Sequence, residues 1–494
     1  MKHFLLILFA GITFSTQAQK LKSSSNQEVI TQHSAVINGV SLKYRAKVGM
    51  LPVWSTSGDS AIASLNYTYY TRNGVDDISK RPLLISFNGG PGSASVWMHI
   101  AYTGPKLLNV DDEGYPIQPY GVKDNPHSLL DVADILYVNP VNTGYSRTVE
   151  TDPKKVKREA FFGINADITY LAAWLTDFMN KENRWLSPKF LIGESYGGTR
   201  VSGLAHELQS KQWMYLNGVV LVSPADYLSF ESDRAISAAL FLPYYTAAAW
   251  YHKKLPLALQ SKSLENILPE VEQYTLNILM PAIAKGGALL TEEKTKIANQ
   301  LEAYTSIPSK AFMDYHLCLP PNYFWKNLLA DEQLTIGRLD SRYKGLDAVF
   351  TGTKPDYNAE LTAWLQAFTP AINSYMQTTL KFKTDLTYNM FGNVHPWDKE
   401  NNNTRENLRQ AMAINPHLKV LFQTGLYDGA TTYFHSKYSM WQLDPSGKLT
   451  DRMSFKTYPS GHMMYLRKDD LIKSTSDLRD FILESVEYGV PVRH

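Results

Sequence analysis

The sequence predicts an α/β fold, in which a mostly parallel central sheet is flanked by helices and carries an inserted helical cap. Short apolar segments end in glycine-rich or polar loops, which is typical of buried parallel strands. Segments with helical periodicity lie between several of them, for example from Ile164 to Met179. This alternation favours a parallel sheet, because parallel neighbours need a long connection that is usually a helix.

The composition is that of an ordinary globular protein. Hydrophobic residues make up 44% and charged residues 19% of the 494 residues, so a large buried core is feasible. The net charge of +2 gives no bias toward polyanions, and we expect the basic segment 154–158 to be a solvated helix start. We therefore expect no nucleic-acid partner. Cys318 is the single cysteine, so an intramolecular disulfide cannot form.

The first residues have the pattern of a secretory signal peptide, which we place at residues 1–18. A short basic start precedes an apolar run from Phe4 to Phe14, and small residues lie ahead of a cut after Ala18. The run is too short to span the ~30 Å of a bilayer core. We therefore expect an exported protein, periplasmic or secreted, without an integral membrane segment. The lack of disulfides fits a bacterial exported protein.

We expect the core in two parts, at residues 19–230 and 386–494, with the helical cap at residues 231–385 between them. Antiparallel strands are expected over about residues 27–70, where Asn38-Gly39 has the sequence of a tight hairpin turn. Later segments that end at loops are the expected strands of the parallel sheet: 82–87, 133–138, 189–192, 218–222, 418–422 and 454–458. A closing helix is expected at 471–486.

A candidate nucleophile, Ser195, lies in Gly193-Glu194-Ser195-Tyr196-Gly197-Gly198, between an apolar strand and a helical pattern. A serine hydroxyl attacks a carbonyl only when it is held exposed and a neighbouring base takes its proton. A Gly-x-Ser-x-Gly turn between strand and helix holds serine on such a sharp bend, and its glycines leave room for crossing backbone. The alternative is a tight turn with an idle serine.

A glycine-rich loop, Asn88-Gly89-Gly90-Pro91-Gly92, follows an earlier strand. The tetrahedral intermediate of acyl transfer needs two converging N–H groups. In this arrangement one comes from the residue after the nucleophile, here Tyr196, and the other from a loop of this kind. We expect the loop to complete an oxyanion hole; the alternative is an ordinary glycine turn.

The base and its orienting carboxylate should follow the nucleophile in the order Ser, Asp, His, just past strand ends. Asp428 follows the strand at 418–422, and His462 follows the strand at 454–458. Together they are better placed than their rivals, so we predict a triad of Ser195, Asp428 and His462. The rivals are His417, His435, Asp444 and Asp451.

In combination these motifs resemble the serine carboxypeptidase family, which has the α/β-hydrolase fold. The matching segments are 88–92, 139–146, 193–198, the Asp428 loop and Gly461-His462-Met463, and the resemblance covers about residues 35–490. The chain departs from the eukaryotic members in three ways. Tyr102 stands where they carry a second glutamate, Ser93 replaces a common cysteine, and the disulfides are absent. The resemblance is therefore to a bacterial-type member.

The resemblance implies removal of one residue from the C-terminus of a peptide through an acyl-enzyme on Ser195, without a metal or cofactor. It implies that His462 is general base and then acid, that Asp428 orients it, and that Gly90 and Tyr196 give the oxyanion amides. The residues that it implies for binding the terminal carboxylate of the substrate are Asn88, Gly89 and Glu194. The second glutamate would help to raise the pKa of the first, so with Tyr102 we expect a weaker acid preference.

Two other functions remain open from the sequence. An esterase or acyltransferase would use the same triad on a small acyl substrate, because the fold does not choose among acyl transfers. A non-catalytic binding protein would keep only a relic of the site. No motif indicates the side-chain preference of the substrate or the oligomeric state.

Overall fold

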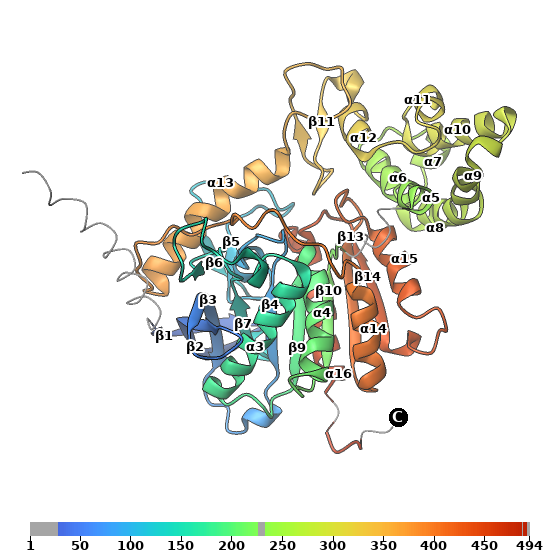
Figure 1. Ribbon diagram of the computed structural model, residues 1–494. Helices are drawn as coiled ribbons and strands as arrows, with labels where there is room; N and C mark the ends of the chain where they lie inside the picture. Colours follow the sequence, from blue (N-terminus) through green and yellow to red (C-terminus); the bar gives the residue numbers. More distant parts are fainter. Residues whose placement is uncertain (1–27, 226–232, 487, 492–494) are drawn as a thin grey trace, which may run out of the picture.

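The computed structural model describes residues 28–225, 233–486 and 488–491 of the chain. Within these residues the main sheet has ten strands in the order β1-β2-β3-β7-β4-β9-β10-β13-β14, with β8 (Arg147–Thr148) beside β3 (Figure 1). The predicted signal peptide, residues 1–18, lies outside the described residues.

The first three strands are antiparallel, as predicted. They are β1 (Glu28–Ile37), β2 (Val40–Trp54) and β3 (Ala61–Arg72). The turn between β1 and β2 has φ of 48° at Asn38 and 77° at Gly39. This is the left-handed conformation that an Asn-Gly pair adopts at low cost, so the hairpin follows from local sequence.

The strands from β7 to β14 run parallel to one another. In spatial order they are β7 (Asp134–Val138), β4 (Leu83–Phe87), β9 (Lys189–Glu194), β10 (Gly218–Val222), β13 (Lys419–Gly425) and β14 (Met453–Tyr458). Every residue of the central strand β9 is buried. Each lies where a strand was expected, so the predicted mostly parallel sheet is confirmed.

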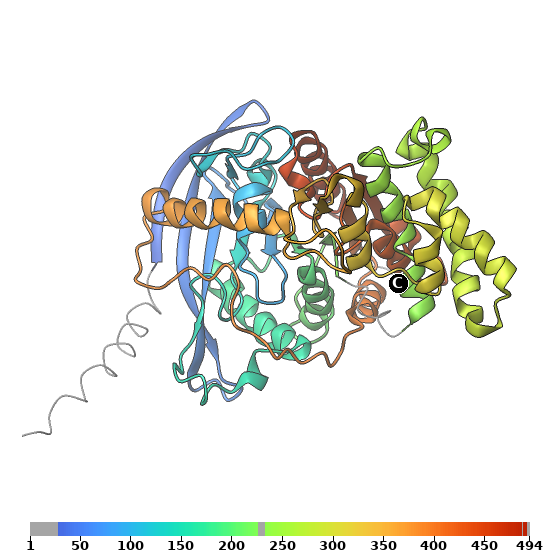
Figure 2. The same ribbon diagram turned by 90° about the horizontal axis from the view of Figure 1, so that it is seen from above.

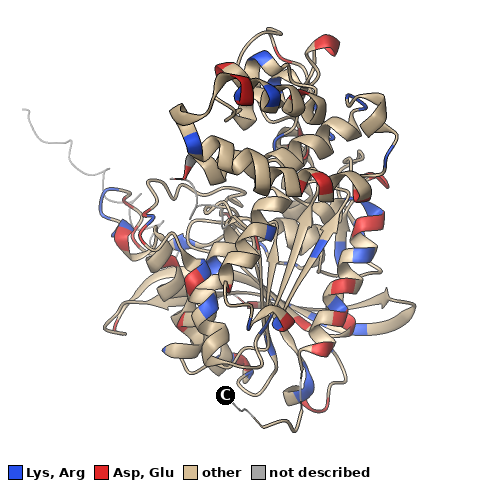
Figure 3. Cartoon of the chain, turned by 90° about the vertical axis from the view of Figure 1, so that its right-hand side faces the viewer, with Lys and Arg blue, Asp and Glu red and all other residues tan. Residues whose placement is uncertain are grey.

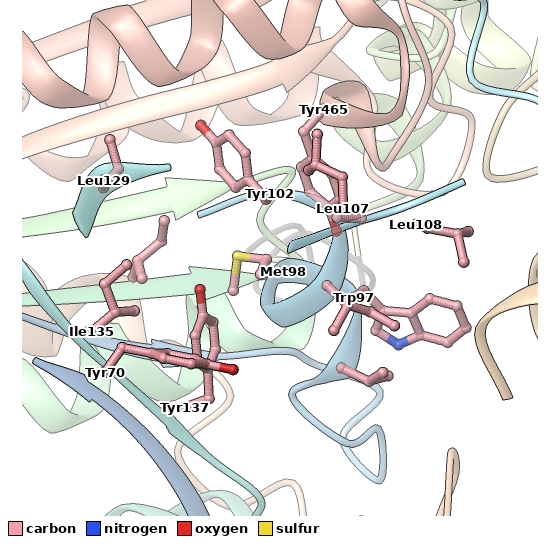
Figure 4. Close-up of a cluster of buried hydrophobic side chains, with 14 of the residues drawn as sticks. Tyr70, Trp97, Met98, Tyr102, Leu107, Leu108, Leu129, Ile135, Tyr137 and Tyr465 are labelled. Atoms are coloured by element: carbon pink, nitrogen blue, oxygen red, sulfur yellow. The ribbon is translucent and has the colours of Figure 1, made fainter. Parts of the chain in front are cut away.

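Helices cover both faces of the sheet, and alternate strand residues divide between two hydrophobic cores. Leu191 packs with the first face, which is covered by α3 (Ile164–Glu182), α4 (Tyr196–Ser210) and α14 (Thr404–Ile414). Ile192 packs with the second face, which is covered by α2 (Val96–Ala101), α13 (Ala359–Ser374) and α16 (Lys468–Glu484). This is the period-two burial of a strand buried on both sides. Figure 4 shows Trp97 and Met98 of α2 within the second core.

The segment expected to form the cap is mostly helical. The helices at one end of the molecule are α5 (Arg234–Ala239), α6 (Leu242–Tyr251), α7 (Leu257–Gln260), α8 (Leu264–Tyr274), α9 (Met280–Lys285), α10 (Thr291–Thr305), α11 (Ser309–Asp314) and α12 (Pro321–Asn327) (Figure 1). They enclose a hydrophobic core of their own. A small sheet follows, formed by β11 (Thr335–Ile336) and β12 (Lys344–Gly345).

Helix α13 belongs to the same inserted segment but packs differently. Figure 2 shows it lying apart from α5 to α12, and Trp364 and Phe368 of α13 join the core of the sheet rather than that of the cap helices. The ring of Phe368 lies 4.6 Å from that of Trp97 in α2. The insertion therefore contributes both a helical cap and one helix that covers the sheet.

The basic segment 154–158 is not a helix start, although Lys154, Lys155 and Lys157 are exposed as expected. The side chain of Asp152 accepts a hydrogen bond from the amide of Lys154 at 3.0 Å, which favours a turn over a helix. A short 3₁₀ turn, η3 (Arg158–Ala160), follows, and helix α3 begins only at Ile164.

Charged side chains of both signs are mixed on the core and the cap, as Figure 3 shows. This agrees with the net charge of +2. In the described part of the chain, no helix combines the length and the apolar character needed to cross a membrane.

Candidate active site

Ser195 lies on the sharp bend between β9 and α4. Its φ of 58° and ψ of −126° are outside the regions that ordinary residues prefer, so the backbone is strained at the candidate nucleophile. The bend is held because the amide of Ser195 donates to the carbonyl of Val222 at 2.9 Å. A Cβ on Gly193 would lie 2.1 Å from the carbonyl oxygen of Gly197, so only glycine allows the strand and helix to cross this closely.

The glycine loop after β4 lies directly against this bend. A Cβ on Gly89 would be 2.5 Å from the amide nitrogen of Tyr196. Gly90, with φ of 107°, Tyr196 and Ser195 line the same cavity. The structure therefore brings both predicted oxyanion residues to the nucleophile, because a loop without side chains can approach the start of a helix.

His462 is paired with Asp428. The distance from His462 Nδ1 to Asp428 Oδ2 is 2.7 Å, and both side chains are buried. Burial lowers the pKa of His462, but the charge and hydrogen bond of Asp428, together with Glu194, outweigh it and raise this pKa above its ordinary value. An Asp-held imidazole of this kind can accept a proton at Nε2 and return it.

Asp428 is itself fixed by the loop that follows it. Its Oδ1 accepts hydrogen bonds from the amides of Ala430 at 2.8 Å and Thr431 at 3.1 Å. The Thr431 hydroxyl lies 2.6 Å from Asp428 Oδ2 and 3.1 Å from His462 Nδ1. These bonds leave the carboxylate one orientation, with Oδ2 facing the imidazole.

The rival residues lie elsewhere. His435 is in α15 (Tyr433–Leu443), where its Nδ1 is 2.7 Å from the hydroxyl of Thr432, and burial lowers its pKa to about 4. His417 precedes β13, at the opposite end of that strand from Asp428. Asp444 accepts bonds from residues of its own turn, including Leu449. The geometry therefore pairs His462 with Asp428.

Ser195, His462 and Glu194 share a cavity of about 460 Å³. Aromatic side chains form much of its wall, namely Trp97, Trp364, Phe391 and Trp397. Trp364 comes from α13, so the inserted segment helps to shape the cavity. Loop residues Arg338 and Leu339, between β11 and β12, line it as well.

Glu194 is a buried carboxyl in this cavity, 3% exposed. Burial raises its pKa to about 7, against the lowering effects of His462 and of hydrogen bonds from Tyr465 and Asn88. The hydroxyl of Tyr465 donates to Glu194 Oε1 at 2.7 Å, and the side-chain amide of Asn88 donates to Oε2. Glu194 is therefore a carboxyl that can carry a proton near neutral pH.

Of the three residues predicted to bind the substrate carboxylate, two line the cavity and one does not. Gly89 and Glu194 line the cavity, whereas Asn88 lies fully buried behind them. The side chain of Asn88 is engaged at both ends, since its nitrogen donates to Glu194 and its oxygen accepts from the amide of Met98 at 3.2 Å. Asn88 thus positions Glu194.

Arg200, which the sequence did not indicate, donates hydrogen bonds to backbone carbonyls of the glycine loop. Its guanidinium is fully buried and donates to Asp167 at 2.6 Å, to the carbonyl of Asn88 at 2.6 Å and to that of Pro91 at 3.2 Å. Thr431 and Tyr465 were also missed. Tyr465 follows His462 by three residues, so its proximity in sequence could have indicated a place at the site. No feature of the sequence indicates the position of Arg200.

The family model described as serine carboxypeptidase matches residues 54–458. The chain belongs to the serine carboxypeptidase family. The order of the glycine loop, Ser195, Asp428 and His462 in the chain is the order in which the family resemblance placed them. Among the described residues, no cluster of three or more His, Cys, Asp or Glu side chains is suited to hold a metal ion.

Relatives within the serine carboxypeptidase family are distant. "Serine carboxypeptidase S10 family member 1" of Dictyostelium discoideum is 28% identical over 152 residues, which are 30% of this chain and 32% of that protein. "Serine carboxypeptidase-like 45" of Arabidopsis thaliana is 25% identical over 267 residues, which are 47% of this chain and 52% of that protein. The chain thus spans between 32% and 52% of the length of these two relatives.

A solved structure shows the same fold. The prohormone-processing carboxypeptidase KEX1 of Saccharomyces cerevisiae superimposes with a TM-score of 0.53 over 90% of this chain and 92% of that chain, at 15% identity. At this identity the likeness concerns the fold alone. It confirms the α/β-hydrolase fold that the sequence predicts for this serine carboxypeptidase family member.

Proposed function

We propose that this protein is a serine carboxypeptidase, which hydrolyses the C-terminal peptide bond of peptides through an acyl-enzyme on Ser195. One observation carries the proposal. The cavity lined by Ser195 and by His462, which is paired with Asp428, is also lined by Glu194, a buried carboxyl with a pKa of about 7. Acyl-transfer residues and a group suited to a carboxylate therefore lie side by side, and membership of the family supports this assignment.

The proposed reaction begins with attack of Ser195 Oγ on the scissile carbonyl carbon. His462 Nε2 takes the hydroxyl proton, while Asp428 holds the Nδ1–H and stabilises the imidazolium. The amides of Gly90 and Tyr196 bind the oxyanion of the tetrahedral intermediate. His462 then protonates the leaving amine, the C–N bond breaks, and the C-terminal amino acid departs. Water, deprotonated by His462, hydrolyses the acyl-enzyme in the same two steps.

Glu194 would recognise the terminal carboxylate of the substrate in its protonated form. Two carboxylates can share a buried pocket only if one carries a proton, because two negative charges there repel strongly. Below a pH of about 7 the proton of Glu194 can be donated to the substrate carboxylate. Asn88 and Tyr465 hold Glu194 in place, and Gly89 lines the cavity where its amide can add a second donor.

The test compares free-acid peptides with the same peptides amidated at the C-terminus, by kcat/KM at about pH 5 and about pH 8, on either side of ordinary histidine titration. The proposal predicts a strong preference for free acids at the lower pH and a smaller one at the higher pH. Equal cleavage of amides and free acids at both values would overturn carboxylate recognition.

The same substrate panel includes simple esters, because Tyr102 replaces the second glutamate of the eukaryotic members. Ester turnover without peptide turnover would make the protein an esterase or acyltransferase. Labelling of Ser195 by a fluorophosphonate probe tests whether the site reacts at all. Absence of labelling would leave the non-catalytic binding protein as the remaining function.

We also propose that the protein is exported to the periplasm or secreted after removal of residues 1–18. The basic start, apolar run and small residues before position 18 support this. N-terminal sequencing of the mature protein from fractionated cells tests it, with residue 19 as the expected first residue. An intact N-terminus in the cytoplasmic fraction would contradict it.

A further inference from the structure

Arg338 is a cation that the inserted segment places at the candidate active site. It lies in the loop between β11 and β12 and lines the cavity that contains Ser195 and His462. Its side chain is exposed. Neither the triad nor the oxyanion hole needs a positive charge at this point.

The backbone beside Arg338 is tied to the loops of the triad. The amide of His462 donates to the carbonyl of Leu339 at 2.7 Å, and the amide of Gly429 donates to the carbonyl of Arg338 at 2.9 Å. The amide of Leu339 donates in turn to the buried carboxyl of Glu360 at 2.8 Å. Arg338 therefore projects from a loop whose position is fixed relative to the reacting groups.

Among the described residues no ion pair holds the guanidinium of Arg338, although its charge lowers the pKa of the buried Glu360. The guanidinium of neighbouring Arg342 is held by Asp340 at 2.6 Å. Among the described residues that line the cavity, Glu194 is the only carboxyl, and Lys399 is a second cation. The charge of Arg338 reaches the triad, because it lowers the pKa of His462 against the larger effect of Asp428. The cavity thus offers a positive charge, carried on a fixed stretch of backbone, to a substrate that enters it.

We propose that Arg338 is a specificity-determining residue that favours peptides with an Asp or Glu side chain at one of the two residues flanking the scissile bond. The inference rests on the proposed carboxypeptidase function and adds to it the chemical class of the substrate. A guanidinium presents a planar pair of donors to a carboxylate, which a lysine ammonium does not. The terminal carboxylate of the substrate is a second negative group that Arg338 could bind. The experiment below distinguishes it from a side-chain carboxylate.

The kinetic experiment uses matched peptides that differ only by Glu or Gln at each of the two flanking positions, measured as kcat/KM at low salt. We expect the wild type to prefer Glu at one position by about fivefold, the size of a partly solvated ion pair. Arg338→Gln should abolish this preference and Arg338→Lys should keep part of it, while high salt weakens it in the wild type. Lys43→Gln, at an exposed position of β2 that does not line the cavity, is the control and should change nothing.

Binding to the Ser195→Ala variant separates this inference from the proposed function, because it needs no turnover. The Kd of the Glu peptide should be about fivefold lower than that of the Gln peptide, and Arg338→Gln in the same background should remove the difference. Equal Kd values in both backgrounds would overturn the inference even if the peptides are cleaved. A loss of discrimination between free acid and amide, with no change in the ratio of Glu to Gln, would assign Arg338 to the terminal carboxylate and also overturn it.

Discussion

The ring of Tyr102 stacks on the ring of Tyr465, with their centroids 4.6 Å apart and 11° between their planes. Tyr465 donates to Glu194, and Tyr102 donates to Gln423 at 2.8 Å. Tyr102, which the family resemblance aligns with the second glutamate of the eukaryotic members, therefore packs against the tyrosine that donates to Glu194. Burial is the largest cause that raises the pKa of Glu194, to about 7, and the charge of Asp428 adds to it, so this carboxyl can stay protonated without a second glutamate beside it.

Tyr465→Phe should shift the pH at which free-acid preference is lost to a higher value. The hydroxyl of Tyr465 lowers the pKa of Glu194, so its removal raises that pKa and keeps Glu194 protonated over a wider range. The measurement is the ratio of kcat/KM for free-acid and amidated peptides as a function of pH. Tyr304→Phe is a matched control, because Tyr304 donates to Glu270 in the cap at 2.8 Å. A downward shift would contradict the role given to Tyr465.

Glu194→Gln should extend free-acid cleavage to pH values above 7 and leave amidated substrates nearly unchanged. Glutamine keeps a hydrogen-bond donor and cannot ionise, so the loss of activity that accompanies ionisation of Glu194 should disappear. The acidic limb, where His462 becomes protonated, should remain. The comparison is the pH profile of kcat/KM for wild type and variant on the same free-acid peptide. If both decline alike above pH 7, Glu194 does not bind the terminal carboxylate in its neutral form.

Ser195→Ala and His462→Ala should each lower kcat by a factor on the order of 10⁴–10⁶, with the fold retained. Asp428→Asn should cost somewhat less, because Asp428 orients the imidazole and does not transfer the proton. Steady-state kinetics on one ester and one peptide gives the comparison. His417→Ala and His435→Ala are the controls, and an inactive His435→Ala protein that is folded would move the base away from His462.

The positions of the candidate triad residues and of the glycine loop at strand ends could be predicted, because each depends on a short local segment. Ser195 and Asp428 follow the buried strands β9 and β13, and His462 follows the half-buried strand β14. Parallel strands bring such ends to one edge of the sheet. The hairpin at Asn38 followed from local turn chemistry in the same way. In contrast, the prediction of a helix start at 154–158 was wrong. The side chain of Asp152 accepts a hydrogen bond that favours a turn, and the pattern of charges alone does not indicate this turn.

Contacts between distant segments could not be predicted. Arg200 in α4 bonds to Asp167 in α3 and to the loop after β4, and no spacing in the sequence encodes that meeting. The packing of α13 against α2 is similar, since its apolar stripe would equally suit the cap helices. Arg338 lies in a loop without a motif, so only the fold places its charge at the cavity.

Arg200→Met should both destabilise the protein and slow catalysis. Removing the guanidinium leaves the buried Asp167 without its cationic partner and with only the Tyr170 hydroxyl as a side-chain donor, and loss of one partner costs about 3–5 kcal/mol in comparable buried pairs. It also releases the carbonyls of Asn88 and Pro91 in the loop that carries Gly90. Chemical denaturation and kcat are measured together. Adding Asp167→Asn should recover part of the stability and little of kcat; full recovery of kcat would show that Arg200 does not position the loop.

Glu360→Gln should change how stability depends on pH. Glu360 is fully buried, and burial raises its pKa from 4.5 to about 7. The folded state therefore holds a proton that the unfolded state has lost between these two values, so wild-type stability decreases as pH rises through this window. The full effect corresponds to about 3 kcal/mol. A glutamine side chain cannot titrate, so the variant lacks this decrease, while the contribution of Glu194 is present in both proteins and cancels.

The measurement for Glu360→Gln is the free energy of unfolding from denaturant titrations at intervals between about pH 4 and about pH 8, which brackets the shifted carboxyl. Glutamine keeps an oxygen for the amide of Leu339 but puts an NH₂ group where Oε2 has no partner, which adds a cost that does not depend on pH. The diagnostic quantity is therefore the slope of the free energy of unfolding against pH. The stability of the variant should rise relative to that of the wild type as pH increases. Glu159→Gln, at an exposed carboxyl, serves as the control. A difference between Glu360→Gln and wild type that stays constant across the range would mean that Glu360 does not titrate there.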